Sequence, residues 1–339
     1  MNKLLTVVVP VYKVERYINK CLDSLILPDN QMDLVEVIVV NDGTPDQSAV
    51  MAKEYEKRFP NTFHVIDKEN GGHGSAWNRG VAEATGKYLR FLDSDDWLTN
   101  LSEFIELLKD CDSDLVFTDL RCCYENTNKE IVYENHVMEP NHQYYTDTFD
   151  WEKHSSVYTD YNVTNFHKCT YKTQLLKEQH PLFVERIFYD DEILFVAPLC
   201  FAKTFISYHL ILYNYLLGRE GQTMDHKVML RNINFKLQIR KYVLDYYSRQ
   251  SLTSPFVKAK IESVLQSRSN DTTMLISGLS YTQSKEQMRD LSLFMEKNYP
   301  HLRKGVSYKI YDLSFSIWWL LYHYARPIWQ FIRAKVLKM

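Results

Sequence analysis

The first hundred or so residues alternate between two kinds of segment, and this alternation constrains the fold more than any other feature of the sequence. Short apolar runs of strand length lie at Leu4–Val9, Leu34–Val40, Thr62–Ile66 and Tyr88–Leu92. Such runs are typical of strands buried on both faces of a sheet. The segments between them have helical spacing of apolar residues, as at Val14–Ile26, Gln47–Phe59 and Gly74–Ala84. The pattern predicts an α/β fold with a mostly parallel sheet and right-handed crossovers.

The size and composition of the chain limit its class. Its 339 residues, 45% of them hydrophobic, are enough for one large domain with an appendage or for two domains. A net charge of −3 gives no support for a nucleic-acid partner. The six cysteines form no Cys-x-x-Cys pair, which favours a reduced, cytoplasmic protein. No signal peptide or long apolar run is visible, so we expect no membrane-spanning helix.

Three carboxylates, Asp93, Asp95 and Asp96, follow the fourth expected strand within four positions. Because like charges repel and burial strengthens the repulsion, such a cluster favours a bound cation. Asp93 and Asp95 form an Asp-x-Asp pair of hard oxygen ligands suited to Mg²⁺ or Mn²⁺, ions that also bind water and phosphate oxygens. The alternative is an Asp/Ser turn that caps a helix beginning near Trp97.

Other polar segments also follow expected strands, where ligands of parallel sheets bind. Pro10–Tyr12 follows the first strand and Asp42 the second. The Asp42 carboxylate could accept hydrogen bonds from a nucleotide base, or it could belong to an Asp-Gly turn that needs no ligand. The glycine-rich Asn70–Gly74 begins a helix, where backbone could approach an anion; the alternative is a flexible loop.

In this order the segments resemble the family 2 glycosyltransferases of bacterial polysaccharide pathways, which are inverting enzymes with the GT-A fold. The matching stretches are Val8–Tyr12, Glu15–Ile18, Val39–Thr44, Asn70–Gly72 with Ala76, Asn78 and Gly80, Gly86–Tyr88, and Asp93–Asp96. As an ordered set they are far more specific than any one motif. The resemblance implies transfer of a sugar from a nucleotide diphosphate sugar, by family a UDP-sugar, to an acceptor hydroxyl, with Mn²⁺ or Mg²⁺ as cofactor.

Two later stretches resemble the family more loosely. Phe188–Glu192 resembles an acidic pair near the acceptor, with Asp190 where Glu is usual. Tyr213–Tyr215 and Arg219–Thr223 resemble the aromatic strand and loop that close over the diphosphate, with Gln222 where Ser is usual.

A further departure is Trp77, which stands where the family usually has Arg, and Arg79 is near enough in sequence to replace its phosphate contacts.

The resemblance also implies roles for individual residues. The expected donor-binding residues are Pro10, Tyr12, Glu15, Asp42, Asn70, Gly71, Arg79, Asp93, Ser94 and Arg219. Asp95, with Asp93, is expected to hold the metal, and Asp96 to cap the next helix or support the site.

Asp191 is the candidate base for the acceptor hydroxyl; alternatively, the three consecutive acids form a solvated helix start. Arg219 either clamps the diphosphate or lies on the surface. His73 and His167 could contact donor or acceptor, although a lone histidine is more often structural or solvated.

The C-terminal third is expected to be helical, which gives two parts: a catalytic domain over 1–225 and a helical region over 226–339, with a break near Ser269–Asp271. Within Tyr308–Met339, aromatic residues beside basic ones suit a helix lying in a membrane interface, at the inner face of the plasma membrane. The alternative is a helix packed on the catalytic domain or on another subunit. Partners would be the donor and a glycan or lipid-linked glycan acceptor.

Two rival functions remain open at this point. The first is a catalytically silent nucleotide-sugar binding module, which the two acidic clusters oppose. The second is a sugar nucleotidyltransferase. Those enzymes usually carry a glycine-rich loop after the first strand, and Pro10–Lys13 contains no glycine.

Overall fold

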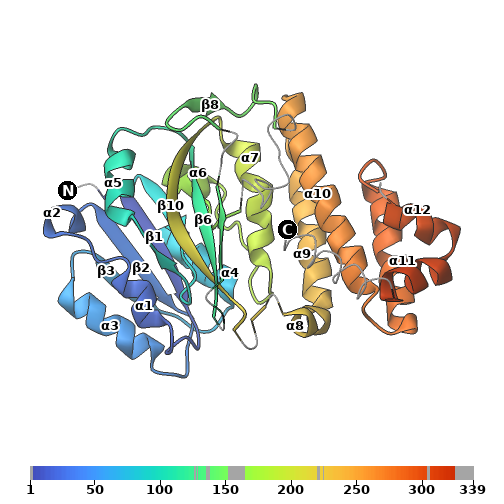
Figure 1. Cartoon of the computed structure of the whole chain (residues 1–339), viewed down its shortest axis with the longest axis horizontal. Coiled ribbons are helices and arrows are strands. Elements are labelled where there is room, and N and C mark those ends of the chain that lie inside the picture. Colours follow the sequence, from blue (N-terminus) through green and yellow to red (C-terminus); the bar gives the residue numbers. More distant parts are fainter. Residues whose placement is uncertain are drawn as a thin grey trace.

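The computed structural model describes residues 3–125, 127, 129–134, 138–151, 165–219, 222–223, 225–303 and 306–324. Within these residues it has one ten-stranded sheet flanked by helices, and a group of C-terminal helices that stands beside the sheet (Figure 1). The expected α/β architecture is therefore confirmed.

The four expected strands form the core of the sheet. They are β1 (Leu5–Val11), β2 (Val35–Asn41), β3 (Phe63–Asp67) and β4 (Tyr88–Phe91), and they pair in parallel in the order β3-β2-β1-β4. Every residue of β1 and β4 is buried, as the continuous apolar runs predict. The intervening helices are α1 (Ile18–Asp23), α2 (Asp29–Met32), α3 (Ser48–Arg58) and α4 (His73–Glu83).

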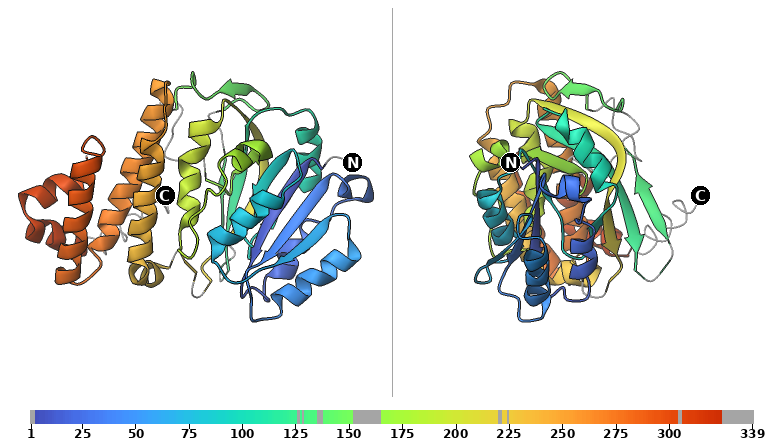
Figure 2. Two further views of the ribbon diagram at one scale, coloured as in Figure 1. Left: turned by 180° about the vertical axis from the view of Figure 1, so that it is seen from behind. Right: turned by 90° about the vertical axis from the view of Figure 1, so that its left-hand side faces the viewer.

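The order of these strands reverses direction once. The chain moves outward from β1 to β3 and then returns past β1 to β4. With right-handed crossovers, α1 and α3 cover one face of the sheet and α4 covers the other (Figure 2). Gly80 lets α4 lie close against β1, because a Cβ atom there would overlap the side chain of Val8. The carboxyl ends of β1, β2 and β4 meet at this reversal, where doubly wound sheets bind ligands.

The rest of the sheet is mixed. Its strands are β5 (Trp97–Leu98), β6 (Leu115–Tyr124), β7 (Glu130–Tyr133), β8 (Gln143–Tyr145), β9 (Cys169–Lys172) and β10 (Thr204–Leu217). β9 lies antiparallel between β4 and β6, and the long β10 is parallel to β6. The helical elements here are α5 (Leu101–Lys109), α6 (Thr173–Glu178), the 3₁₀ helix η1 (Asp190–Phe195) and α7 (Ala197–Phe201).

No helix begins near Trp97, so that expectation is wrong. Trp97 and Leu98 pair with β10 instead, and α5 starts only at Leu101. Asp96 therefore caps no helix. Its carboxylate accepts hydrogen bonds from the Tyr213 hydroxyl (2.6 Å) and the Leu216 amide (2.7 Å), so a distant strand determines its position.

The C-terminal region is helical, as expected. Its helices are α8 (His226–Arg231), α9 (Ile233–Ser248), α10 (Pro255–Ile276), α11 (Tyr281–Asn298) and α12 (Val306–Leu313). Asp225 caps α8 by accepting hydrogen bonds from the amides of Lys227 and Val228. Among the described residues, no helix is both long enough and apolar enough to cross a bilayer.

The expected break near Ser269–Asp271 is wrong, because α10 continues through it. The polar side chains there do not interrupt the helix. Ser269, Thr272 and Thr273 are buried in it, and the hydroxyls of Thr272 and Thr273 donate to the carbonyls of Arg268 and Asn270.

Candidate active site

The three carboxylates after β4 point in different directions. Asp93 faces His73, with 3.1 Å between Oδ1 and Nε2, and Asp95 faces Arg219. Asp96 is buried against β10. Burial and the neighbouring carboxylates raise the pKa of Asp95 to about 6 and hold the pKa of Asp96 well above its usual value. We call Asp93, Asp95 and Asp96 together the acidic tip. A cation bound there would relieve the repulsion between the carboxylates.

His73 joins the acidic tip to the second acidic cluster. Its Nε2 lies 3.1 Å from Asp93 and its Nδ1 lies 3.1 Å from Asp190. Burial lowers the pKa of His73, but the two carboxylates outweigh burial and raise that pKa well above its usual value. A protonated imidazole donates from both nitrogens. His73 therefore lies as a cation between the segment after β4 and the start of η1.

Asp191 lies at the first turn of η1, between two acids that are held in place. Asp190 binds His73, and the buried Glu192 pairs with Lys236 (2.5 Å) and Arg240 (2.8 Å) of α9. Asp191 is only partly buried. Burial and then the charges of Asp190 and Glu192 raise its pKa to about 7. The carboxyl group of Asp191 can therefore both hold and release a proton near neutral pH.

Arg219 lies at the acidic tip. Its guanidinium is 2.5 Å from Asp95, and both side chains are mostly buried. The structure therefore brings together the residue expected to clamp the diphosphate and the residue expected to bind the metal. In this arrangement each neutralises the other.

Asp42 organises the glycine-rich loop. Its carboxylate accepts hydrogen bonds from the amides of Gly71 and Gly72 (both 2.8 Å) and pairs with Lys68 (2.7 Å). The side-chain amide of Asn70 donates to the Asp42 carbonyl. These contacts use most of the hydrogen-bond acceptor positions of the Asp42 carboxylate. The sequence had suggested that this carboxylate could bind a nucleotide base.

The same loop packs tightly against the chain before η1. Gly72 has a φ of +86°, and the Gly71 carbonyl accepts a hydrogen bond from the Arg186 amide (2.7 Å). A Cβ on Gly74 would lie 2.5 Å from the Val184 carbonyl oxygen and 2.9 Å from Asp190. Glycine at position 74 thus permits the approach between His73 and Asp190.

Trp77 and Arg79 point to opposite sides of α4. Trp77 is fully buried and stacks on Phe91 at 4.3 Å between centroids, directly under His73. Arg79 lies on the exposed face and pairs with Glu83 at 2.9 Å. The substitution of Trp for the usual Arg therefore gives a hydrophobic base to the site, and Arg79 is engaged by Glu83 on the exposed face of α4.

The remaining expected donor residues surround the ends of β1 and β2. Pro10 is buried in β1 and Ser94 is buried beside Asp93, whereas Tyr12 is 44% exposed. The Glu15 carboxylate accepts a hydrogen bond from the Gln47 amide. A hollow of about 320 Å³ lies here, lined by Lys13, Glu15, Arg16, Tyr17, Pro45 and Asp46.

A metal ion has a possible ligand set that differs in part from the expected pair. Ligand atoms of Asp93, Asp96 and His167 lie within 4.8 Å of one another. The Nδ1 of His167 contacts Asn165, and its buried Nε2 has no hydrogen-bond partner. Burial lowers the pKa of His167 to about 3, which leaves a neutral imidazole. Neutral imidazole and carboxylate are suitable donors for Mn²⁺, so the residues present fit such an ion.

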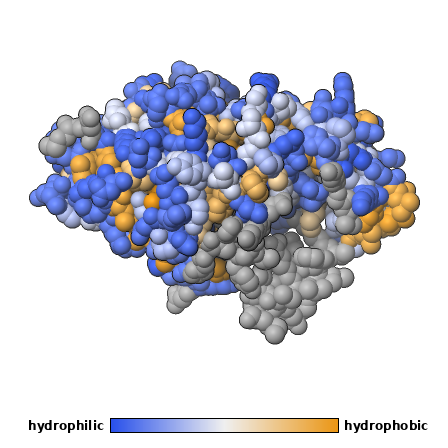
Figure 3. Space-filling view, turned by 90° about the horizontal axis from the view of Figure 1, so that it is seen from above, coloured by the Kyte–Doolittle hydropathy of each residue, from blue (hydrophilic) through white to orange (hydrophobic). Residues whose placement is uncertain are grey.

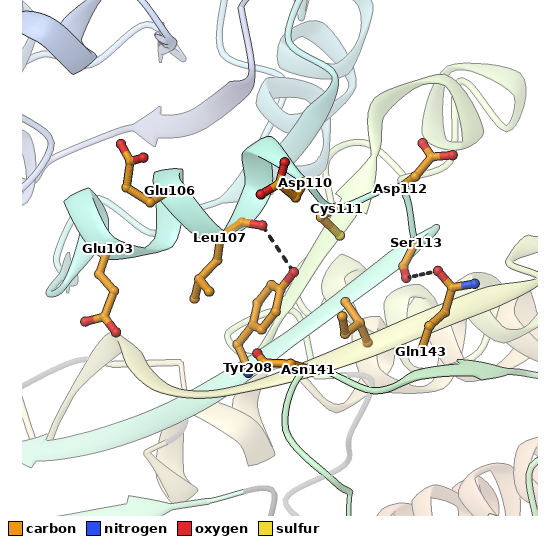
Figure 4. Close-up of a pocket in the computed structure, with 11 residues that line it drawn as sticks. Glu103, Glu106, Leu107, Asp110, Cys111, Asp112, Ser113, Asn141, Gln143 and Tyr208 are labelled. Atoms are coloured by element: carbon orange, nitrogen blue, oxygen red, sulfur yellow. Dashed lines mark hydrogen bonds between the residues drawn. The ribbon is translucent and has the colours of Figure 1, made fainter.

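A second hollow, larger than the one beside Glu15, lies elsewhere. Its volume is about 420 Å³, and it lies between α5 and β10, with acidic side chains around it (Figure 4). The Tyr208 hydroxyl donates to the Leu107 carbonyl, and the Ser113 hydroxyl donates to Gln143 across it. None of the expected site residues lines this hollow.

The sequence did not reveal several contacts that organise the site. Tyr213 donates to Asp96 and accepts from the Asp93 amide, and Lys236 and Arg240 hold Glu192. His73 was expected only as a possible contact to donor or acceptor, and the structure places it between Asp93 and Asp190. For the α9 cations no local signal existed, because they lie 44 and 48 residues from Glu192.

Comparison with known proteins agrees with this geometry. Residues 6–170 match the sequence model described as "Glycosyl transferase family 2". "Uncharacterized glycosyltransferase EpsJ" of Bacillus subtilis (strain 168) is 42% identical over 100 residues, which are 30% of this chain and 28% of EpsJ. "Minor teichoic acid biosynthesis protein GgaB" of the same organism is 40% identical over 91 residues, 27% of this chain and 10% of GgaB. The chain thus spans less than a third of either relative.

A solved structure shows the same fold over a longer range. The fragment 1–349 of S. aureus TarS superposes with a TM-score of 0.66 and 19% identity, and the match covers 96% of this chain and 87% of that one. The likeness in fold therefore extends beyond residues 6–170 into the C-terminal helices. Residues 6–170 of this chain therefore form a domain of the family 2 glycosyltransferases.

Proposed function

We propose that this chain is an inverting glycosyltransferase that moves a sugar from a UDP-sugar to a hydroxyl group of a glycan or lipid-linked glycan, at the cytoplasmic side of the plasma membrane. The observation that carries the proposal is the His73 link between the acidic tip and the start of η1, because it joins a donor site to a candidate base. GgaB is named for teichoic acid biosynthesis, which supports a cell-wall glycopolymer as the product. The TarS fragment has been crystallised with UDP-GlcNAc, which supports a UDP-sugar donor.

Inverting transfer needs a base on the acceptor side of the sugar. The acceptor oxygen attacks the anomeric carbon, the bond from that carbon to the diphosphate breaks, and the hydroxyl proton passes to the base. Asp191 suits this role because it is partly accessible and has a pKa of about 7. Asp190 and Glu192, each tied to cationic side chains, fix the backbone that carries it.

The donor's diphosphate would lie at the acidic tip. Asp93 and Asp95 would hold Mn²⁺ or Mg²⁺, and Asp96 and His167 are near enough to Asp93 to add ligand atoms. Bound there, the cation would offset the negative charge that the leaving diphosphate gains. Arg219 would exchange its contact with Asp95 for a phosphate oxygen, which a guanidinium binds bidentately.

A panel of nucleotide sugars tests the activity. The full chain is incubated with each sugar and with Mn²⁺ or Mg²⁺, and the released nucleotide is measured. We expect release with at least one UDP-sugar and a larger rate when an acceptor glycan is added. A protein that binds UDP-sugars but releases no nucleotide under any of these conditions would be a binding module instead.

The role of Asp191 has a sharper test. We expect Asp191→Asn to leave the dissociation constant for the donor unchanged and to lower the transfer rate by about 10²- to 10⁴-fold, the usual contribution of a general base. Glu185→Gln is the matched control, since Glu185 is an exposed acid in the same segment. Normal turnover by Asp191→Asn would remove Asp191 from the role.

A further inference from the structure

The last described helical segment, residues 306–324, is apolar on two sides. Its helical hydrogen bonds continue through Ser314, which donates to the Ile310 carbonyl and accepts from the Trp318 amide (both 2.9 Å). One side packs inward: Tyr308 and Trp318 are 1% and 0% exposed. His323 contacts the Ser277 carbonyl at the end of α10. This side therefore explains how the segment attaches to the other helices.

The opposite side is apolar and exposed. Its residues and their exposed fractions are Leu313 (79%), Ile317 (47%), Leu320 (51%), Leu321 (48%) and Tyr324 (63%). Spacings of three and four residues place them on one face of a helix. We call these five side chains the outer face. The end of the molecule formed by the C-terminal helices carries an apolar patch in the space-filling view (Figure 3).

The sequence from residue 313 onward carries basic residues but no acidic ones. Residues 313–324 contain no Asp, Glu, Lys or Arg. The chain that follows, 325–339, lies outside the described residues, and its sequence contains Arg326, Arg333, Lys335 and Lys338 but no acidic residue. An uncharged apolar face thus leads directly into a basic segment.

We propose that the outer face docks on the surface of a lipid bilayer with anionic headgroups. The aliphatic side chains would enter the boundary between headgroups and acyl chains, and the positive charge of the sequence that follows favours anionic over neutral lipids. A helix of this kind lies in the plane of the membrane and does not span it. The proposal does not depend on sugar transfer.

A second copy of the chain is a poorer occupant. In a two-fold symmetric contact the same patch meets itself. Each copy would also add the sequence that directly follows its outer face, which has four cationic residues and no acid. Like charges oppose that arrangement, whereas an anionic bilayer complements it.

Vesicle flotation of the full chain tests the proposal. We expect the wild-type protein to float with vesicles that contain about 30% phosphatidylglycerol, to float less at high salt, and to stay unbound with phosphatidylcholine alone. The double variant Leu320→Glu/Leu321→Glu should bind the anionic vesicles about tenfold more weakly, since two exposed aliphatic side chains are replaced by acids.

Val50→Glu is the matched control. Val50 is 56% exposed on α3, in the sheet part of the molecule (Figure 1), and its replacement should leave vesicle binding unchanged. Thermal midpoints of both variants confirm that they fold, and donor hydrolysis in solution should be the same in both. Equal vesicle binding by the wild type and the double variant would overturn the proposal. So would a wild-type dimer that the double variant loses while neither protein floats, because the outer face would then bind a second copy.

Discussion

His73 and Arg219 each place a positive charge among carboxylates that would otherwise repel one another. His73 lies between Asp93 and Asp190, and Arg219 contacts Asp95. Within the described part of the chain Asp191 forms no ion pair, and its pKa is raised where those of Asp93 and Glu192 are lowered. Environment thus separates the acid that can exchange a proton from the acids that stay ionised.

The pKa of Asp191 predicts the pH dependence of transfer. A base must be deprotonated to act, so the rate should rise as the pH increases through about 7 and then level off. The measurement is the transfer rate at saturating donor between pH 5.5 and 8.5, where about tenfold per pH unit is expected on the acidic side. A rate that is flat across this range would contradict the role of Asp191.

Measurements of metal affinity distinguish two possible ligand sets. One is Asp93 with Asp95, and the other is Asp93 with Asp96 and His167. We expect Asp93→Ala and Asp95→Ala to weaken Mn²⁺ binding by at least about tenfold, as loss of a charged ligand does, and His167→Ala to weaken it less, since imidazole is neutral. Electron paramagnetic resonance of free Mn²⁺, titrated in the presence of UDP, measures this directly. A stronger effect of His167→Ala than of Asp95→Ala would identify Asp93, Asp96 and His167 as the metal site.

At the scale of elements, η1 depends on α9. Glu192 is 3% exposed and pairs with Lys236 and Arg240, and Arg240 is itself 1% exposed. Burial raises the pKa of Glu192, but Arg240 and Lys236 outweigh it and lower the pKa to about 2. The ion pairs therefore connect the candidate base to a helix outside the family-matched segment.

Glu192→Ala should lower the free energy of unfolding by about 3–5 kcal/mol, because it leaves buried cations without a partner. Chemical denaturation at pH 7 measures the change, with the exposed Glu185→Ala as control. The wild-type contribution of Glu192 is fully present above its ordinary pKa of 4.5 and is lost as the pH falls toward 2. Equal stability of the two variants would show that the ion pairs contribute little.

The elements that could be predicted from sequence are those defined by local pattern. The strands β1 to β4 are short, mostly apolar runs, and their bounds agree with prediction to within two residues. Trp97–Leu98 was missed because pairing with β10, more than a hundred residues later, overrides its helix-like context. The link from His73 to Asp190 spans 117 residues, so no local pattern contains it.

At the scale of the whole molecule, the division at residue 225 remains a prediction, and the contacts oppose an independent first part. The Tyr242 hydroxyl of α9 donates to the Leu182 carbonyl, and the α9 cations hold Glu192. The helical region therefore supports the candidate active site as well as the proposed membrane surface.

Removal of residues 226–339 tests this dependence. We expect a chain of residues 1–225 to be poorly soluble or to unfold with a broad transition, because it exposes the surface that packs on α9 and loses the two cations that pair with Glu192. Circular dichroism melts and analytical gel filtration measure the outcome. A soluble fragment with a sharp transition would establish residues 1–225 as an autonomous domain.

The contact between Arg219 and Asp95 has a consequence for how substrates assemble. In the structure Arg219 contacts Asp95, a carboxylate that we propose as a ligand of the metal. A diphosphate that draws Arg219 away from Asp95 would therefore raise the affinity of the protein for the metal. Because coupling between two binding sites is reciprocal, the bound metal would raise the affinity for the diphosphate by the same factor. Under the proposed chemistry, nucleotide and cation would load cooperatively, so that neither accumulates in the site alone.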